Sequence, residues 1–155
     1  MKHKTRPWAL LMVEDNPHDI LAAKRVWHQF GFNNHLSIVS DGEECLDYLF
    51  HQRSYADPVL APRPDVVLLD LKLPKLDGHQ VLTRIREEQR FRYLPVIILT
   101  DSTLEIDRQK GYEQGCNAYL KKPVGFAEFA ELLTSLRTFW SAVEPYSQAL
   151  PAEEI

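Results

Sequence analysis

The sequence has few cysteines and no long apolar run. Its two cysteines, Cys45 and Cys116, are too few for a disulfide-stabilised scaffold and lack the spacing of a metal site. No stretch approaches the roughly 18 apolar residues that cross a membrane. The apolar segment 8–13 after the basic N-terminus is interrupted by two acids, so it is shorter than the core of a signal peptide. We therefore expect a soluble, reduced, cytoplasmic protein that does not bind membranes.

The sequence also lacks an excess of positive charge. Its net charge is −4 and its pI is near 5.8, which argues against nucleic acid as a partner because nucleic-acid binding needs a basic face. A length of 155 residues suits one domain. We expect an N-terminal extension at 1–7, the domain at 8–143 and a C-terminal tail at 144–155. We expect no appended DNA-binding or catalytic domain, since the chain ends shortly after the last predicted helix. The tail has two prolines and three glutamates and is not expected to form a globular element of its own.

Strand and helix patterns alternate along the whole chain. Strands are predicted at 8–13, 35–39, 66–69, 96–99 and 117–120, each followed by a helix, at about 17–30, 42–50, 79–90, 102–115 and 126–143. Three prolines between residues 53 and 64 predict a loop without regular structure. Five such units predict an α/β fold of the flavodoxin-like, doubly wound type, with a five-stranded parallel sheet in the order 2-1-3-4-5.

Sequence signals for helix starts accompany three of these helices. Asn16 before Pro17 suits an N-cap followed by a first helical residue. Asp41 with Glu44, and Ser102 with Glu105, match the capping-box pattern in which two residues three apart satisfy each other's backbone donors.

Chemically useful groups follow the predicted strands. Asp70 ends the apolar run 66–69, Glu14-Asp15 follows the first strand, Thr100 follows the fourth, and Lys121-Lys122 follows the fifth. Taken singly, each has a plain structural explanation, such as a helix-terminal charge or a solvated lysine. In a parallel sheet, however, the carboxyl ends of the strands meet at one edge, where open α/β folds place their sites. Together they indicate a functional site.

Three carboxylates at one point repel one another unless a cation relieves the charge. Mg²⁺ suits this purpose because it prefers oxygen ligands and commonly links carboxylates to a phosphate. A carboxylate beside such an ion can act as a nucleophile and form an acyl phosphate. The ammonium of Lys122 and the hydroxyl of Thr100 are groups that offset charge on a transferring phosphoryl group. The pattern therefore indicates that Asp70 accepts phosphate.

At this point the chain resembles the receiver domain of two-component response regulators, from about residue 8 to 143. The matching segments are Val13-Glu-Asp-Asn16, Leu68-Leu-Asp-Leu-Lys-Leu-Pro-Lys-Leu-Asp-Gly78, Ile98-Leu-Thr100 and Tyr119-Leu-Lys-Lys-Pro123. The resemblance implies that Asp70 is phosphorylated by a kinase histidine, in a signalling protein that is not an enzyme in its own right.

The same resemblance implies specific roles around Asp70. Asp15 and Asp70 would bind Mg²⁺ together with the backbone carbonyl of Lys72, and Glu14 would act through water. Lys122 would bind the phosphate, with Lys121 a bystander, and the Lys122–Pro123 peptide bond would be cis. Tyr119 stands where the family carries an aromatic switch residue, although a half-buried strand tyrosine explains it equally well.

A narrower resemblance is to the single-domain regulators paired with phytochrome-type histidine kinases. It is carried by the proline-rich loop before residue 65, the run from Leu73 to Gly78 and the closing Phe139-Trp140. It implies a light-sensing kinase partner and a homodimer whose C-terminal segment embraces the other subunit. Apolar residues near the end of the chain are consistent with an interface: Phe139, Trp140, Val143, Tyr146 and Leu150. Trp140 could equally be core.

Asp101 departs from the family pattern, which has a small residue after the conserved hydroxyl. Its carboxylate could repel the phosphoryl group and alter how long the phosphate survives, or it could point outward beside Ser102.

Three other functions share parts of this pattern. A flavodoxin-type carrier needs a phosphate-binding loop after the first strand, where Glu14-Asp15 would repel its cofactor. An aspartyl-phosphate hydrolase needs an acid two residues after its nucleophile, where this chain has Lys72. A degenerate receiver would act only as a phosphorylation-independent binding module, and Asp101 leaves that alternative open.

Overall fold

A computed structural model of the protein describes residues 8–29 and 34–144. Five strands alternate with helices: β1 (Ala9–Val13), α1 (Pro17–Gln29), β2 (His35–Val39), α2 (Gly42–Leu49), β3 (Val66–Leu69), α3 (Gly78–Glu87), β4 (Val96–Thr100), α4 (Glu105–Glu113), β5 (Ala118–Lys121) and α5 (Phe126–Ala142). All strand pairs are parallel and their order is β2-β1-β3-β4-β5. The predicted flavodoxin-like fold and strand order are confirmed.

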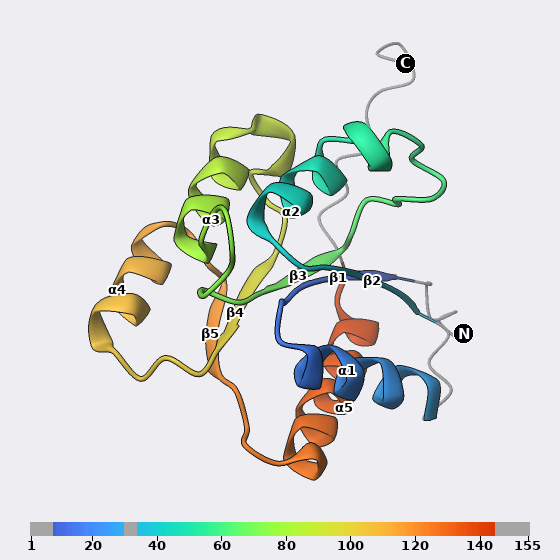
Figure 1. The fold of residues 1–155 in the computed structure, drawn as a ribbon, viewed down its shortest axis with the longest axis vertical. Coiled ribbons are helices and arrows are strands. Elements are labelled where there is room, and N and C mark those ends of the chain that lie inside the picture. Colours follow the sequence, from blue (N-terminus) through green and yellow to red (C-terminus); the bar gives the residue numbers. More distant parts are fainter. Residues whose placement is uncertain (1–7, 30–33, 145–155) are drawn as a thin grey trace.

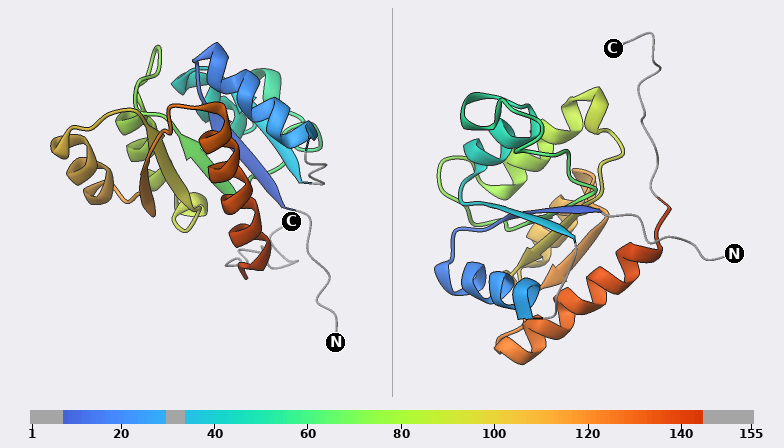
Figure 2. Two further views of the ribbon diagram at one scale, coloured as in Figure 1. Left: turned by 90° about the horizontal axis from the view of Figure 1, so that it is seen from below. Right: turned by 90° about the vertical axis from the view of Figure 1, so that its right-hand side faces the viewer.

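Helices cover both faces of the sheet (Figure 1). α1 and α5 lie together on one face and α2 and α3 on the other, with α4 beside β5. The view along the sheet edge separates these layers (Figure 2). Every residue of β3 and β4 is buried, as expected for central strands covered on both sides. The described helices include none that is long and apolar enough to cross a membrane.

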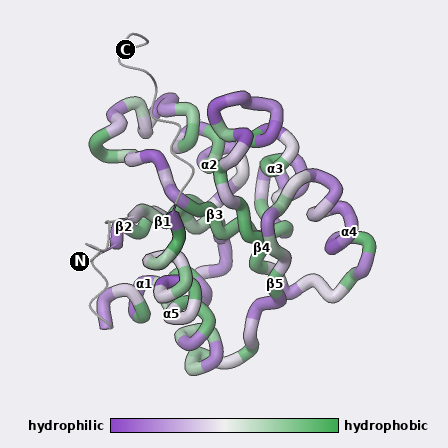
Figure 3. Tube along the Cα trace, turned by 180° about the vertical axis from the view of Figure 1, so that it is seen from behind, coloured by the Kyte–Doolittle hydropathy of each residue, from purple (hydrophilic) through white to green (hydrophobic). Residues whose placement is uncertain are grey.

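Hydropathy follows the same layering (Figure 3): the central strands are the most apolar part of the chain, whereas α4 is largely hydrophilic. The only buried residue of α4 is Gly111, where an added Cβ would lie 2.8 Å from Ile98 Cδ1. α4 therefore contributes little to the core.

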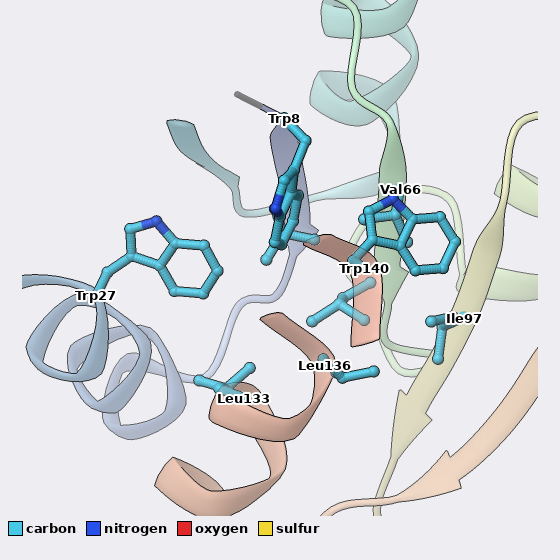
Figure 4. A pocket seen from close by; sticks show the side chains of 9 residues that line it. Trp8, Trp27, Val66, Ile97, Leu133, Leu136 and Trp140 are labelled. Carbon is cyan, nitrogen blue, oxygen red and sulfur yellow. The ribbon is translucent and has the colours of Figure 1, made fainter. Parts of the chain in front are cut away.

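Aromatic residues close the core between the sheet and the α1–α5 layer (Figure 4). The side chains of Trp8, Trp27 and Trp140 line a small apolar pocket there together with residues of the sheet and α5. Trp8 and Trp27 meet edge to face with ring centroids 6.2 Å apart. Trp140 therefore belongs to the core side of α5, whereas its neighbour Phe139 is 63% exposed.

Two of the predicted helix starts are confirmed. Asn16 Oδ1 accepts a hydrogen bond from His18 N at 2.9 Å, and α1 begins at Pro17. Asp41 is the N-cap of α2 and accepts from Glu44 N at 2.7 Å. In a full capping box the Glu44 carboxylate would also accept from Asp41 N. Here it accepts from Ser40 N, so the box is incomplete.

The predicted capping box at Ser102 is wrong. α4 begins at Glu105 with Leu104 as its N-cap, because Ser102 is tied to the end of β4 through its N–H, which donates to Thr100 Oγ1 at 3.3 Å. A full capping box instead opens α3, where Asp77 and Gln80 match the same sequence pattern.

Two further boundaries differ from prediction. The loop after α2 contains a short 3₁₀ helix, Arg53–Tyr55, because its prolines come later in the chain. α3 ends at Glu87, before residue 90, and a separate 3₁₀ turn, Gln89–Phe91, follows it.

Candidate functional site

Backbone pairing continues past the ends of the central strands. Glu14 N donates to Val39 O at 2.9 Å, and Asp70 N donates to Val13 O at 3.1 Å. Since β1 lies between β2 and β3, these bonds place the residues that follow β1 beside the residue that follows β3. The strand order predicted from sequence therefore brings Glu14 and Asp70 together at one edge of the sheet.

Glu14, Asp15 and Asp70 form an acidic cluster. Each offers one carboxylate oxygen, and these oxygens all lie within 4.8 Å of one another. Glu14 and Asp70 are buried, with 1% and 6% of their surface exposed, whereas Asp15 is exposed. A set of closely spaced carboxylate oxygens open to solvent on one side fits a hard divalent cation such as Mg²⁺.

Lys122 supplies the positive charge of the site. Its Nζ lies 2.6 Å from Glu14 Oε2, 2.9 Å from Asp19 Oδ2 and 2.9 Å from Asp70 Oδ2, and its side chain is 9% exposed. Lys122 N donates to Thr100 O at 2.8 Å, which holds the lysine beside the end of β4. Lys121 is exposed, so the structure distinguishes the two lysines as the sequence predicts.

Burial and neighbouring charges shift the pKa values of Glu14 and Lys122. Burial raises the pKa of Glu14 to about 7; the hydrogen bond from Lys122 limits the rise and the nearby Asp70 charge adds to it. Burial by itself would lower the pKa of Lys122, but the hydrogen bonds to Glu14, Asp70 and Asp19 outweigh it and hold the pKa above its ordinary value. Lys122 is therefore a fixed cation among three carboxylates.

The predicted cis peptide bond at Lys122–Pro123 is wrong, because the described residues contain no cis peptide bond. Trans is the lower-energy form of an X–Pro bond by about 0.5–1 kcal/mol. In the trans form Lys122 already reaches its three carboxylates, so this geometry does not require the cis isomer.

The loop between β3 and α3 is held close to Asp70. Lys72 N donates to Asp70 Oδ1 at 3.3 Å, and Gly78 N donates to Leu71 O at 2.8 Å. Gly78 is required by this approach, since an added Cβ would lie 2.3 Å from Asp70 O. The backbone carbonyl of Lys72 as a metal ligand stays a prediction.

Asp101 points outward. Its side chain is 69% exposed and lies 3.7 Å from Nζ of Lys72, which is also exposed, at 75%. An exposed pair of this kind is screened by solvent and contributes little to stability. Of the two alternatives for Asp101, the structure supports the outward one.

Thr100 is fully buried and begins a polar network that leads away from the acids. Thr100 Oγ1 accepts from Ser102 N, Ser102 Oγ donates to Asp107 Oδ2 at 2.6 Å, and His79 Nε2 lies 3.2 Å from Asp107 Oδ1. The half-buried Tyr119 donates from its hydroxyl to Ser102 O at 3.4 Å. The network therefore connects Thr100 to α4, to α3 and to the predicted switch residue.

These contacts also perturb ionisation. The hydrogen bond from Ser102 lowers the pKa of Asp107, with His79 adding to the effect. Burial raises the pKa of Tyr119 above its ordinary value, and the hydrogen bond to Ser102 opposes this rise without cancelling it.

Sequence reasoning missed four residues of this region: Asp19, His79, Ser102 as a link, and Asp107. Asp19 carried a signal, because it is the third residue of a helix whose N-cap, Asn16, directly follows the acidic pair. Asp107 and His79 come from different helices and are brought together only by tertiary structure, so no spacing in the sequence indicates them.

Comparisons with known proteins agree with this geometry. Residues 10–134 match the family model of the response regulator receiver domain. Two curated relatives are a probable methanogenesis regulatory protein FilR2 of Methanothrix harundinacea, 35% identical over 86% of this chain and 84% of the relative, and the response regulator Rcp1 of Synechocystis sp., 33% identical over 86% and 89%.

Solved structures of related regulators superpose over nearly the whole chain. The phosphorylated cyanobacterial phytochrome response regulator RcpA is 30% identical, with a TM-score of 0.84 over 92% of this chain and all of RcpA. The Mn²⁺-bound form of Rcp1 is 32% identical, with a TM-score of 0.81 over 91% of this chain and all of Rcp1. With the matched family model and the observed strand order, these findings show that the chain belongs to the response regulator receiver domain family, and its relatives include single-domain regulators of the phytochrome type.

Proposed function

We propose that this protein is a single-domain response regulator that accepts a phosphoryl group on Asp70. The observation that carries the proposal is the placement of Asp70 between two oxygen-rich neighbours, Glu14 and Asp15, and the ammonium of Lys122 at 2.9 Å. A carboxylate in this setting has a cation to bind the incoming phosphoryl oxygens and acids to bind a metal. The related RcpA, described as phosphorylated, supports the proposal by analogy.

In the proposed reaction, Asp70 Oδ attacks the phosphorus of a phosphohistidine. A new O–P bond forms as the P–N bond breaks, and the leaving imidazole nitrogen takes a proton. Bound Mg²⁺ would be held by Asp15, Asp70 and the backbone carbonyl of Lys72, with Glu14 acting through water, and would neutralise charge on the phosphoryl oxygens. Lys122 would donate to one of those oxygens, and Thr100 would donate to another.

We propose a phytochrome-type histidine kinase as the partner. The support is the likeness to RcpA, which is described as a cyanobacterial phytochrome response regulator, over nearly the whole of both chains. The proposed domain at 8–143 contains all the residues with roles in the reaction. Of the proposed flanking segments, residues 1–7 and 145–155 lie outside the described residues.

The function is tested by phosphorylation of the intact chain. Incubated with a small phosphodonor, or with a phosphorylated phytochrome-type kinase, the protein should gain one phosphoryl group in the presence of Mg²⁺ and none after chelation by EDTA. The metal is required because the three clustered carboxylates repel the negative charge of an incoming phosphoryl group unless a cation offsets it. Intact-protein mass spectrometry measures the gain, and neutral hydroxylamine should remove it, as expected of an acyl phosphate.

A protein that binds Mg²⁺ but gains no phosphate from either donor would instead support the degenerate-receiver alternative. Phosphorylation that survives hydroxylamine would place the group on a different type of side chain.

We further propose that the protein forms a homodimer that responds to phosphorylation. Exposed apolar side chains at the start of α4 and near the end of α5 support an interface: Leu104 is 61% exposed, Ile106 66% and Phe139 63%. The Thr100–Ser102–Asp107 network connects the phosphate site to α4. Tyr146 and Leu150 of the proposed dimer arm lie outside the described residues.

We expect beryllofluoride with Mg²⁺, which imitates the acyl phosphate, to shift the monomer–dimer equilibrium severalfold. A ligand shifts such an equilibrium only by its differential affinity for the two states. Sedimentation velocity over a concentration series, with and without the mimic, measures the shift. An oligomeric state that is identical in both conditions would contradict a phosphorylation-linked switch.

A further inference from the structure

Asp19 is a third carboxylate partner of Lys122 that the sequence argument does not use. It lies in the first turn of α1, and its Oδ2 is 2.9 Å from Lys122 Nζ. The turn that presents it is itself anchored to the site: Asn16 N donates to Glu14 Oε1 at 3.0 Å, and Asn16 Oδ1 accepts from His18 N at 2.9 Å. Asp19 is thus held in a defined position relative to the acidic cluster.

The three carboxylate partners of Lys122 differ in whether they belong to the acidic cluster. A lysine ammonium has three N–H donors, and here three carboxylates surround it. Glu14 and Asp70 belong to the acidic cluster, so metal binding and acyl phosphate formation engage them directly. Asp19 is not a member of that cluster. Its contact with Lys122 therefore does not compete with metal binding or with the acyl phosphate.

We propose that Asp19 is a positioning residue. It keeps the Lys122 ammonium beside Asp70 while Glu14 and Asp70 take part in metal binding and phosphorylation. This inference rests on the proposed phosphorylation of Asp70. A lysine side chain has many rotamers, and holding one of them requires a fixed acceptor. The Asp19 carboxylate, on a helix turn tied to Glu14, is such an acceptor.

A general effect on helix α1 is the competing explanation, because acids in a first turn stabilise a helix by interacting with its dipole. Glu128 provides the matched control. It is also an acid in the first turn of a helix, α5, and no contact of Glu128 with Lys122 is found among the described residues. Removing it should perturb a helix start to a similar degree without touching the site.

The test uses the full chain, saturating Mg²⁺ and a small phosphodonor, and measures the initial rate of phosphorylation. Asp19→Ala should slow the reaction about tenfold, as expected for loss of a hydrogen bond to a charged group. Asp19→Asn should lie between Asp19→Ala and the parent, since its amide oxygen still accepts from the ammonium. Glu128→Ala should react at the parental rate.

Two further measurements separate positioning from simple destabilisation. In a Lys122→Met background, Asp19→Ala should cause no additional slowing, because the group it positions is already gone. In the metal-free protein, the NMR signal of the Lys122 ammonium protons should broaden or disappear in Asp19→Ala through faster exchange with water, and remain in Glu128→Ala.

Several results would overturn the inference. These are a parental or faster rate in Asp19→Ala, equal slowing in Glu128→Ala, or further slowing in the Lys122→Met background. The proposed function fails separately, since in that case the parent protein itself would gain no phosphate. A parent that is phosphorylated, with an Asp19→Ala variant that matches it, would remove only the role of Asp19.

Discussion

Replacing Asp70 by asparagine should reduce phosphorylation by a small phosphodonor at least about 100-fold, the range seen when a group that acts directly in a transition state is removed. The amide is nearly isosteric with the carboxylate but is a poor nucleophile. It also replaces one of the three carboxylates whose oxygens lie within 4.8 Å of one another with a neutral amide, so Mg²⁺ affinity should fall as well. Intact-mass measurement of phosphate incorporation and calorimetric titration with Mg²⁺ check both effects.

Asp101→Asn is the matched control for this variant. Asp101 is an acid close to the same edge of the sheet, but it is exposed and pairs only loosely with Lys72, at 3.7 Å. The Asp101→Asn variant should still accept one phosphoryl group on Asp70 and, since Asp101 points outward, should keep it for as long as the parent does. Full incorporation into Asp70→Asn would overturn the site assignment.

Replacing Gly78 by alanine should cost about 1–3 kcal/mol of unfolding free energy, the range for forcing extra atoms into a close-packed region. The added Cβ would meet Asp70 O at 2.3 Å and Leu71 Cα at 2.7 Å, and both are backbone atoms that cannot rotate away. Relief of this clash requires the β3–α3 connection to move, and Asp70 moves with it. Phosphorylation should therefore slow together with the loss of stability.

Gly125→Ala is the control, because the added Cβ there comes similarly close to another atom, but that atom belongs to a side chain and not to the backbone. Its Cβ would lie 2.1 Å from Glu128 Oε2, the end of a flexible side chain that can turn aside. Gly125 is the N-cap of α5 with an ordinary negative φ, so its loss should cost about 1 kcal/mol or less. Urea unfolding of both variants measures the difference. Equal stability losses in the two variants would contradict the argument from backbone contact.

The main elements of the site could be predicted from the sequence because parallel strands have few possible arrangements. Apolar runs at 66–69 and 96–99 identify central strands, and right-handed crossovers then determine which strand ends adjoin. Glu14 and Asp70 directly follow predicted strands, and Lys122 follows one after a single intervening residue, so their meeting follows from the strand order. Even the choice between Lys121 and Lys122 agrees with the structure, which exposes one and buries the other.

Other features depended on contacts that local sequence does not specify. The capping pattern of Ser102 is a valid local signal, but the backbone of Ser102 is held by Thr100 and its hydroxyl by Asp107. His79 and Asp107 belong to α3 and α4, and nothing in the spacing of 28 residues between them predicts a contact at 3.2 Å.

By itself, the sequence determined the fold class, the strand order and the acidic edge with its lysine, because hydrophobic periodicity and the chirality of parallel sheets leave few alternatives. Only the tertiary structure decided how Lys122 is shared among Glu14, Asp19 and Asp70, that Asp101 points outward, and that Thr100 connects to α4. The physical reason is range: hydrogen bonds and ion pairs act over a few ångströms, and which groups come that close depends on how whole elements pack together.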